Sequence, residues 1–69
     1  MPLTLYPSGQ AVCIKKIGGQ DNTRKFLSSL GFTPGEYVTV ISENGGNMIV
    51  NIKDCRIALD KDLAKRIVV

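Results

Sequence analysis

The chain has 69 residues, of which 43% are hydrophobic and 22% charged, and nine basic against six acidic residues give it a net charge of +3. This length allows one small domain. The core of such a domain is small, and an active-site cleft would reduce it further, which disfavours an enzyme. The absence of histidine removes the commonest general base and metal ligand. The modest basic excess falls short of the dense basic stripe of most nucleic-acid binders.

The first nine residues are predicted to form an irregular lead-in, because Pro2, Pro7 and Gly9 interrupt them. They lack the basic start and the long apolar stretch of a signal peptide. No apolar run in the chain is long enough to span a membrane. We therefore expect a cytoplasmic protein with reduced thiols.

A strand and a helix are predicted next along the chain. The strand occupies Ala11–Ile17, a stretch rich in apolar and β-branched residues, and Gly18 ends it. Asp21 or Asn22 then caps a helix over residues 21–30.

One face of this predicted helix is apolar. The residues that recur along it at helical spacing are Thr23, Phe26, Leu27 and Leu30. We expect this face to pack on the core, with Arg24 and Lys25 on the opposite face. Gly31 follows the last periodic residue and is expected to adopt the left-handed backbone conformation that ends many helices. Pro34, shortly beyond it, is a further stop signal.

Three more strands are predicted in the second half of the chain. They occupy residues 37–41, 48–52 and 55–59. Asn44-Gly45 favours a tight hairpin between the first two strands, and Lys53-Asp54 forms a short turn before the third. Alternate side chains of a strand share one face. Two such sets are Val38 with Val40, and Cys55 with Ile57 and Leu59.

The chain is predicted to end in a short helical turn over residues 60–65, capped by Asp60, and a last strand over residues 67–69 that pairs with an early strand. Together these elements indicate a single domain over residues 1–69. The expected fold is mainly β, a small barrel of about five strands with one inserted helix. A barrel suits this size because closure removes exposed sheet edges. An open sheet with the helix on one face is the alternative.

The two cysteines, Cys13 and Cys55, have two interpretations. Packing in the core is the simpler one, because cysteine is among the residues most often buried. The alternative is a metal-binding pair, to which Asp54 adds an oxygen ligand, although two thiolates leave a transition metal under-coordinated. Turn and helix-cap roles account for Asp54, Asp60 and Asp62. No catalytic residue, metal site or cofactor is therefore predicted.

Basic doublets and one loop aromatic residue are the candidates for partner contact. Lys15 and Lys16 point to opposite faces of a strand and cannot join one patch. Arg24 and Lys25 lie on the exposed face of the helix, either as solvated surface or as a docking site for an acidic partner. Phe32, in the loop after the helix, either covers the end of the core or offers an apolar contact. The predicted partner contacts are Arg24, Lys25 and Phe32.

Three stretches of the chain together resemble the FeoA family, the small cytosolic proteins of bacterial ferrous iron transport. Residues 24–35, RKFLSSLGFTPG, resemble the family's basic helix followed by LxxLG[FML]xPG. Residues 9–17, GQAVCIKKI, resemble its GxxxxIxxI opening strand. Its closing segment is matched by Ile57-Ala58-Leu59, Ala64, Ile67 and Val69. The resemblance covers nearly all of residues 3–69.

This resemblance implies an SH3-like barrel with an inserted helix, in agreement with the order of elements. It also implies a non-enzymatic accessory protein whose partner is FeoB, a membrane Fe²⁺ transporter with a cytosolic G-protein domain. We expect docking to the cytosolic part of FeoB, with no nucleic acid, small-molecule substrate or membrane insertion. The chain has Gly46-Asn47-Met48 where family members often have a Gly-Asp-Pro-like sequence. The alternatives are a metal-sensing or metal-binding barrel that uses Cys13 and Cys55, and a nucleic-acid-binding barrel.

Overall fold

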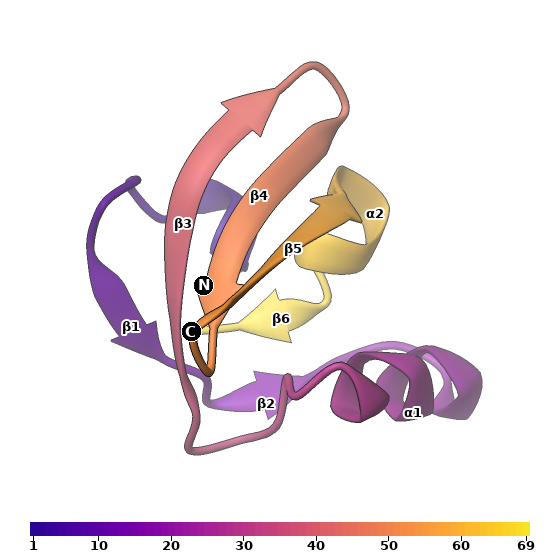
Figure 1. The fold of residues 1–69 in the computed structure, drawn as a ribbon. Helices are drawn as coiled ribbons and strands as arrows, with labels where there is room; N and C mark the ends of the chain where they lie inside the picture. The colour runs from indigo at the N-terminus through magenta and orange to yellow at the C-terminus, as the bar shows by residue number, and fades with distance from the viewer.

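Two antiparallel sheets and two helices make up the fold in the computed structural model, which describes residues 1–69 (Figure 1). In chain order the elements are the 3₁₀ turn η1 (Leu3–Leu5), β1 (Ala11–Cys13), β2 (Lys16–Ile17), α1 (Asp21–Ser29), β3 (Tyr37–Asn44), β4 (Asn47–Ile52), β5 (Cys55–Asp60), α2 (Lys61–Ala64) and β6 (Ile67–Val68). One sheet has the order β1-β3-β4-β5, and the other pairs β2 with β6. The prediction of a mainly β fold with one longer helix and a short C-terminal one is confirmed.

The long hairpins β3-β4 and β4-β5 supply about half of the core, because their alternate side chains point inward. The buried cluster consists of Leu3, Ile14, Leu27, Phe32, Val38, Val40, Met48, Val50, Ile52, Leu59, Ala64, Ile67 and Val69. β3 is longer than predicted and contains a β-bulge, since Val40 pairs with Val50 while Ser42 pairs with Ile49. Ile41 is the extra residue of this bulge and lies exposed at the surface.

The predicted first strand is interrupted between β1 and β2. Ile14 is buried, and its backbone N–H donates to the Glu36 carbonyl at 2.8 Å. The next residue, Lys15, donates instead to the Val68 carbonyl at 2.8 Å. The stretch therefore leaves one sheet and enters the other at this corner. The prediction of one continuous strand was wrong because the two halves have different pairing partners.

The N-terminal segment is more ordered than the predicted lead-in. Its η1 turn buries Leu3 completely. The backbone N–H of Val69 donates to the Met1 carbonyl at 2.8 Å, and the Met1 amino group donates to the Val69 carbonyl at 2.6 Å. Pro2 forms an isolated bridge with Val68. The first residues thus extend the pairing of β6 and cover one end of the core.

Helix α1 projects from the barrel (Figure 1) and buries only Leu27. Phe26 is 50% exposed, so its predicted place on the buried face was wrong. Because α1 contacts the barrel through a narrow strip of its surface, only part of its apolar stripe is buried. Gln20 is the N-cap residue and no side chain caps this end, so the prediction of a cap at Asp21 or Asn22 was also wrong. At the other end, Gly31 has a φ of +104°, as predicted.

The short helix α2 begins as predicted from the sequence. The Asp60 carboxylate accepts a hydrogen bond from the backbone N–H of Leu63 at 2.8 Å. This contact satisfies one of the free donors at the start of a helix. After α2 the chain enters β6, whose pairing with β2 confirms the predicted closing strand.

We expect replacement of Gly31 by alanine to destabilise the protein through its backbone. A Cβ at Gly31 meets only the Lys53 side chain, at 3.7 Å, so the cost arises from the left-handed conformation and amounts to about 1–2 kcal/mol. Thermal unfolding of Gly31→Ala measures this loss. The matched control is Gly46→Ala, where φ lies outside that region and a Cβ meets nothing within 4 Å. Equal losses for the two variants would contradict the assignment.

We expect Asp60→Ala to lower the free energy of unfolding by about 1 kcal/mol, because it removes the cap of α2. Asp62→Ala is the control, since this carboxylate forms only an exposed ion pair with Lys65 at 3.4 Å and such pairs contribute little. Urea unfolding of both variants tests the difference. A loss at position 62 as large as that at position 60 would argue against the cap.

Candidate functional site

A cleft of about 500 Å³ lies beside helix α1 and contains the residues predicted for partner contact. Its walls come from β2, α1 and the segment that follows α1. The lining residues are Lys16, Ile17, Asp21, Arg24, Lys25, Ser28, Phe32, Thr33 and Pro34. The structure therefore brings Arg24, Lys25 and Phe32 together around one hollow, although each plays a different part there.

One face of α1 forms the helical wall of the cleft. The helix residues of the wall are Asp21, Arg24, Lys25 and Ser28. They are spaced at i, i+3, i+4 and i+7, the spacing of a single helical face. This face flanks the anchor residue Leu27, since Arg24 precedes it by three residues. The expectation that Arg24 lies opposite Leu27 was therefore wrong, and the cationic face adjoins the core contact.

Phe32 forms the support of the cleft and has no exposed surface. Its side chain is 0% exposed and belongs to the central core cluster. Its backbone N–H donates to the Leu27 carbonyl at 3.0 Å, which turns the chain sharply after α1. The core interpretation of Phe32 is thus confirmed, and the buried ring offers no exposed surface for the predicted partner contact. Sequence alone left both open because a loop position does not determine where an aromatic ring packs.

The cleft carries an excess of positive charge. Lys16, Arg24 and Lys25 contribute three cations, against one carboxylate at Asp21. Asp21 forms an ion pair with Arg24, in which both side chains are largely exposed, so it stabilises the helix little. Lys16 and Lys25 form no ion pair within the chain. Two positive charges are therefore uncompensated at this surface.

Sequence reasoning missed the contribution of β2 to this surface. It placed Lys15 and Lys16 on opposite faces of one strand, and the structure has only Lys16 in the cleft. The signal was present, because that alternation allowed just one of the two lysines to join the helix. What the sequence lacked was the corner at Ile14, which brings β2 beside α1.

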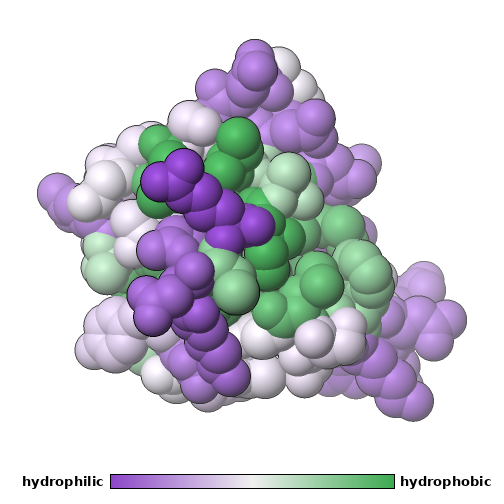
Figure 2. Space-filling view, viewed as in Figure 1, coloured by the Kyte–Doolittle hydropathy of each residue, from purple (hydrophilic) through white to green (hydrophobic).

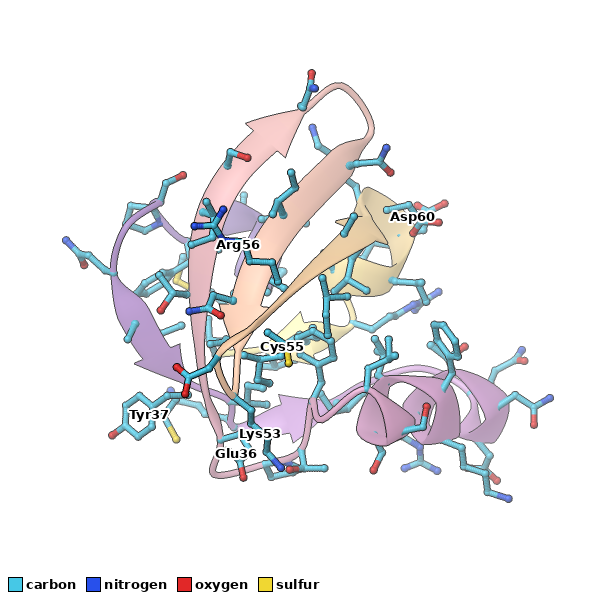
Figure 3. The ribbon with its side chains drawn as sticks, in the orientation of Figure 1. Glu36, Tyr37, Lys53, Cys55, Arg56 and Asp60 are labelled. Atoms are coloured by element: carbon cyan, nitrogen blue, oxygen red, sulfur yellow. The ribbon has the colours of Figure 1, made fainter.

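The two cysteines lie on different faces of the sheet. Cys13 pairs with Tyr37, whose side chain is exposed on the outer face. Cys55 pairs with the buried Ile52 and so belongs to the inner face. It is nevertheless exposed at the barrel end, so its predicted packing was wrong (Figure 3). This placement gives no support to a metal site formed by both thiols.

The acidic residues are also dispersed. No group of three or more cysteine, aspartate or glutamate side chains is positioned to hold a metal ion. Glu36 pairs with Lys53 at 3.6 Å, as Figure 3 lets the reader follow, and Glu43 pairs with Lys61 at 2.5 Å. None of the helices is long and apolar enough to cross a membrane.

Comparison with known proteins gives a consistent result. The FeoA domain family matches residues 1–69. A protein of Methanocaldococcus jannaschii, provisionally named Fe(2+) transport protein A, is 32% identical over 68 residues, which are 99% of this chain and 83% of the relative. The solved iron uptake regulatory protein FeoA is 31% identical with a TM-score of 0.88, over 97% of this chain and 91% of the other.

A further solved structure bears on the fold. The FeoA of Stenotrophomonas maltophilia, described as an SH3 domain protein and solved in complex with zinc, is 28% identical with a TM-score of 0.87. The match covers all of this chain and 88% of the other. The predicted SH3-like architecture is therefore confirmed.

We expect the two phenylalanines, Phe26 on α1 and Phe32 just after it, to differ sharply in their effect on stability. Phe32→Ala removes a fully buried ring and should cost about 3–5 kcal/mol. Phe26→Ala changes a half-exposed side chain and should cost less than about 1 kcal/mol. Thermal unfolding of the matched pair measures both. Comparable losses of stability for the two variants would show that the Phe26 side chain is packed against the barrel.

Proposed function

The chain belongs to the FeoA family of ferrous iron transport, and on that premise we propose that it is a non-enzymatic accessory protein that acts by docking. Its partner is the cytosolic part of a FeoB-type membrane transporter, and its docking surface is the basic cleft between α1 and β2. The observation that carries the proposal is the pair of uncompensated positive charges in this cleft, Lys16 on β2 and Lys25 on α1.

The geometry of the cleft suits a short acidic segment of another protein. Its volume of about 500 Å³ holds a few side chains, and its rim presents Lys16 and Lys25 without intramolecular partners. Charge complementarity of this kind steers association and selects against basic partners. The Arg24 guanidinium can exchange its exposed partner Asp21 for a carboxylate of the bound segment, because exposed ion pairs are weak.

The cationic residues of α1 lie outside the core, so substitutions there should affect docking without affecting folding. α1 is anchored through Leu27, while Arg24 and Lys25 remain exposed. Binding at this face therefore requires no rearrangement of the core. A docked segment can contact the helix and the barrel at the same time. Such a contact would couple binding of this protein to the state of the transporter.

We expect the double variant Arg24→Glu, Lys25→Glu to remain folded and to bind the transporter's cytosolic region more weakly. Each surface substitution should change stability by no more than about 0.5 kcal/mol. The loss of affinity should lie mainly in the association rate and should be larger at low ionic strength. Binding kinetics at two salt concentrations measure both effects.

A control of equal charge change is Lys15→Glu, Lys65→Glu, because neither residue lines the cleft. This control should bind almost as well as the original chain. If both double variants lose affinity equally, net charge and not the cleft governs docking. If the cleft variant binds as fast and as tightly as the original chain at both salt concentrations, this face is not the docking surface. Salt-dependent binding of DNA or RNA would instead favour the nucleic-acid alternative.

A further inference from the structure

The strand β5 is a long unpaired sheet edge. It is the last strand of the four-stranded sheet and spans six residues, Cys55–Asp60. The opposite edge, β1, has only three residues. Figure 1 shows β5 running beside β4 and ending near α2, with no further strand of its sheet beyond it. An exposed edge of this length is a template for the addition of another strand.

The turn before β5 determines which backbone groups lie free. Lys53 and Asp54 both have positive φ, 51° and 62°, and join Ile52 to Cys55 in a two-residue hairpin. In such a hairpin Ile52 and Cys55 exchange hydrogen bonds, so Cys55 and every second residue after it bond to β4. The bond from Lys61 N–H to the Gly46 carbonyl, at 2.9 Å, continues this alternation.

The intervening residues of β5 therefore direct their backbone groups away from the sheet. For Arg56 and Ala58 no hydrogen bond joins these groups to any loop, turn or helix. Both side chains are exposed, on the outer face of the sheet. The edge thus has free donors and acceptors at the spacing that a further antiparallel strand requires.

We propose that two copies of this chain associate by antiparallel pairing of their β5 strands about a two-fold axis at Ala58. In this register Ala58 pairs with Ala58 of the second copy, and Arg56 pairs with Asp60 on either side. Ile57 then lies opposite Leu59 on the inner face. The interaction is self-complementary, as a symmetric dimer interface must be.

Charge selects this register. Arg56 and Asp60 form no ion pair within the chain, and Figure 3 shows them well apart along β5. Antiparallel pairing at Ala58 places each arginine directly opposite an aspartate, on one face. An axis at Ile57 would instead set Asp60 opposite Asp54, an unfavourable pair of like charges.

The surface around the edge supports burial as well as hydrogen bonding. In Figure 2 apolar surface gathers near the centre of the face on which β5 lies, with hydrophilic side chains across it. On β5 itself, Ile57 is a half-buried hydrophobic residue packed against the core. No residue of β5 lines the basic cleft, so the dimer does not depend on the proposed docking function.

The first test is the concentration dependence of self-association, measured by analytical ultracentrifugation at low ionic strength. The original chain should show a weak monomer–dimer equilibrium, since a single strand edge buries a small interface. Arg56→Glu should raise the dissociation constant about tenfold, because both cross-strand pairs then carry like charges. Asp60→Asn, which retains a side chain suited to capping α2, should raise it about threefold.

Lys15→Glu is the control for net charge, because it makes the same change away from β5, and it should leave the dissociation constant within about twofold. Equal effects of Arg56→Glu and Lys15→Glu would overturn the proposed pairing. A chain that stays monomeric at every concentration would overturn it as well, even where β5 is found to add a strand of another protein.

The second test fixes the register by cross-linking. With Cys13 and Cys55 replaced by serine, Ala58→Cys should form a disulfide-linked dimer on mild oxidation. In the proposed register the two copies of residue 58 form a hydrogen-bonded antiparallel pair. The Cα atoms of such a pair are about 5.5 Å apart, which is within disulfide range. In the original chain the two Cys55 residues would lie about 20 Å apart along the strands and should not cross-link. Rapid Cys55 cross-linking, or none at Ala58→Cys, would overturn the register.

Discussion

The C-terminal strand holds the barrel closed, and the other features of the structure depend on that closure. Ile67 and Val68 pair with β2, while Val69 exchanges backbone hydrogen bonds with Met1. This one segment therefore fixes both the N-terminal turn and the strand that forms a wall of the cleft. In a chain with only 13 buried residues, few other contacts can compensate for its loss.

Closure also explains how a short chain presents a helix as an exposed, charged surface. β2 is held by β6, and α1 follows β2 after a short loop, so the start of the helix is fixed by the barrel. Its end is fixed by the turn at Gly31 and the buried ring of Phe32. Between these two points only Leu27 is buried. The remaining helix surface is thus free to carry charge without a cost to the core.

The sequence was informative where one local rule determines the outcome. Alternation along β3 and β5 predicted which side chains share the inner face, because each of these strands has one buried face. Gly31 and Asp60 were predictable because a left-handed position and a helix cap each favour few residue types. The break at Ile14 and the exposure of Phe26 were not predictable in this way, since both depend on which distant segment packs against them.

The same distinction separates the fold from the candidate site. The residues that carry the family resemblance are mostly structural, since Leu27, Phe32, Leu59, Ala64, Ile67 and Val69 are buried and Gly31 forms the turn. A resemblance at such buried positions is therefore strong evidence for the barrel fold and weak evidence for the identity of a partner. Both proposals place recognition on the exposed cations around the cleft and on the free edge of β5, where packing does not restrict the choice of side chain. Related barrels can therefore keep one core and differ in the charges they present, and the proposed contacts of this chain rest on Lys16, Arg24, Lys25 and Arg56.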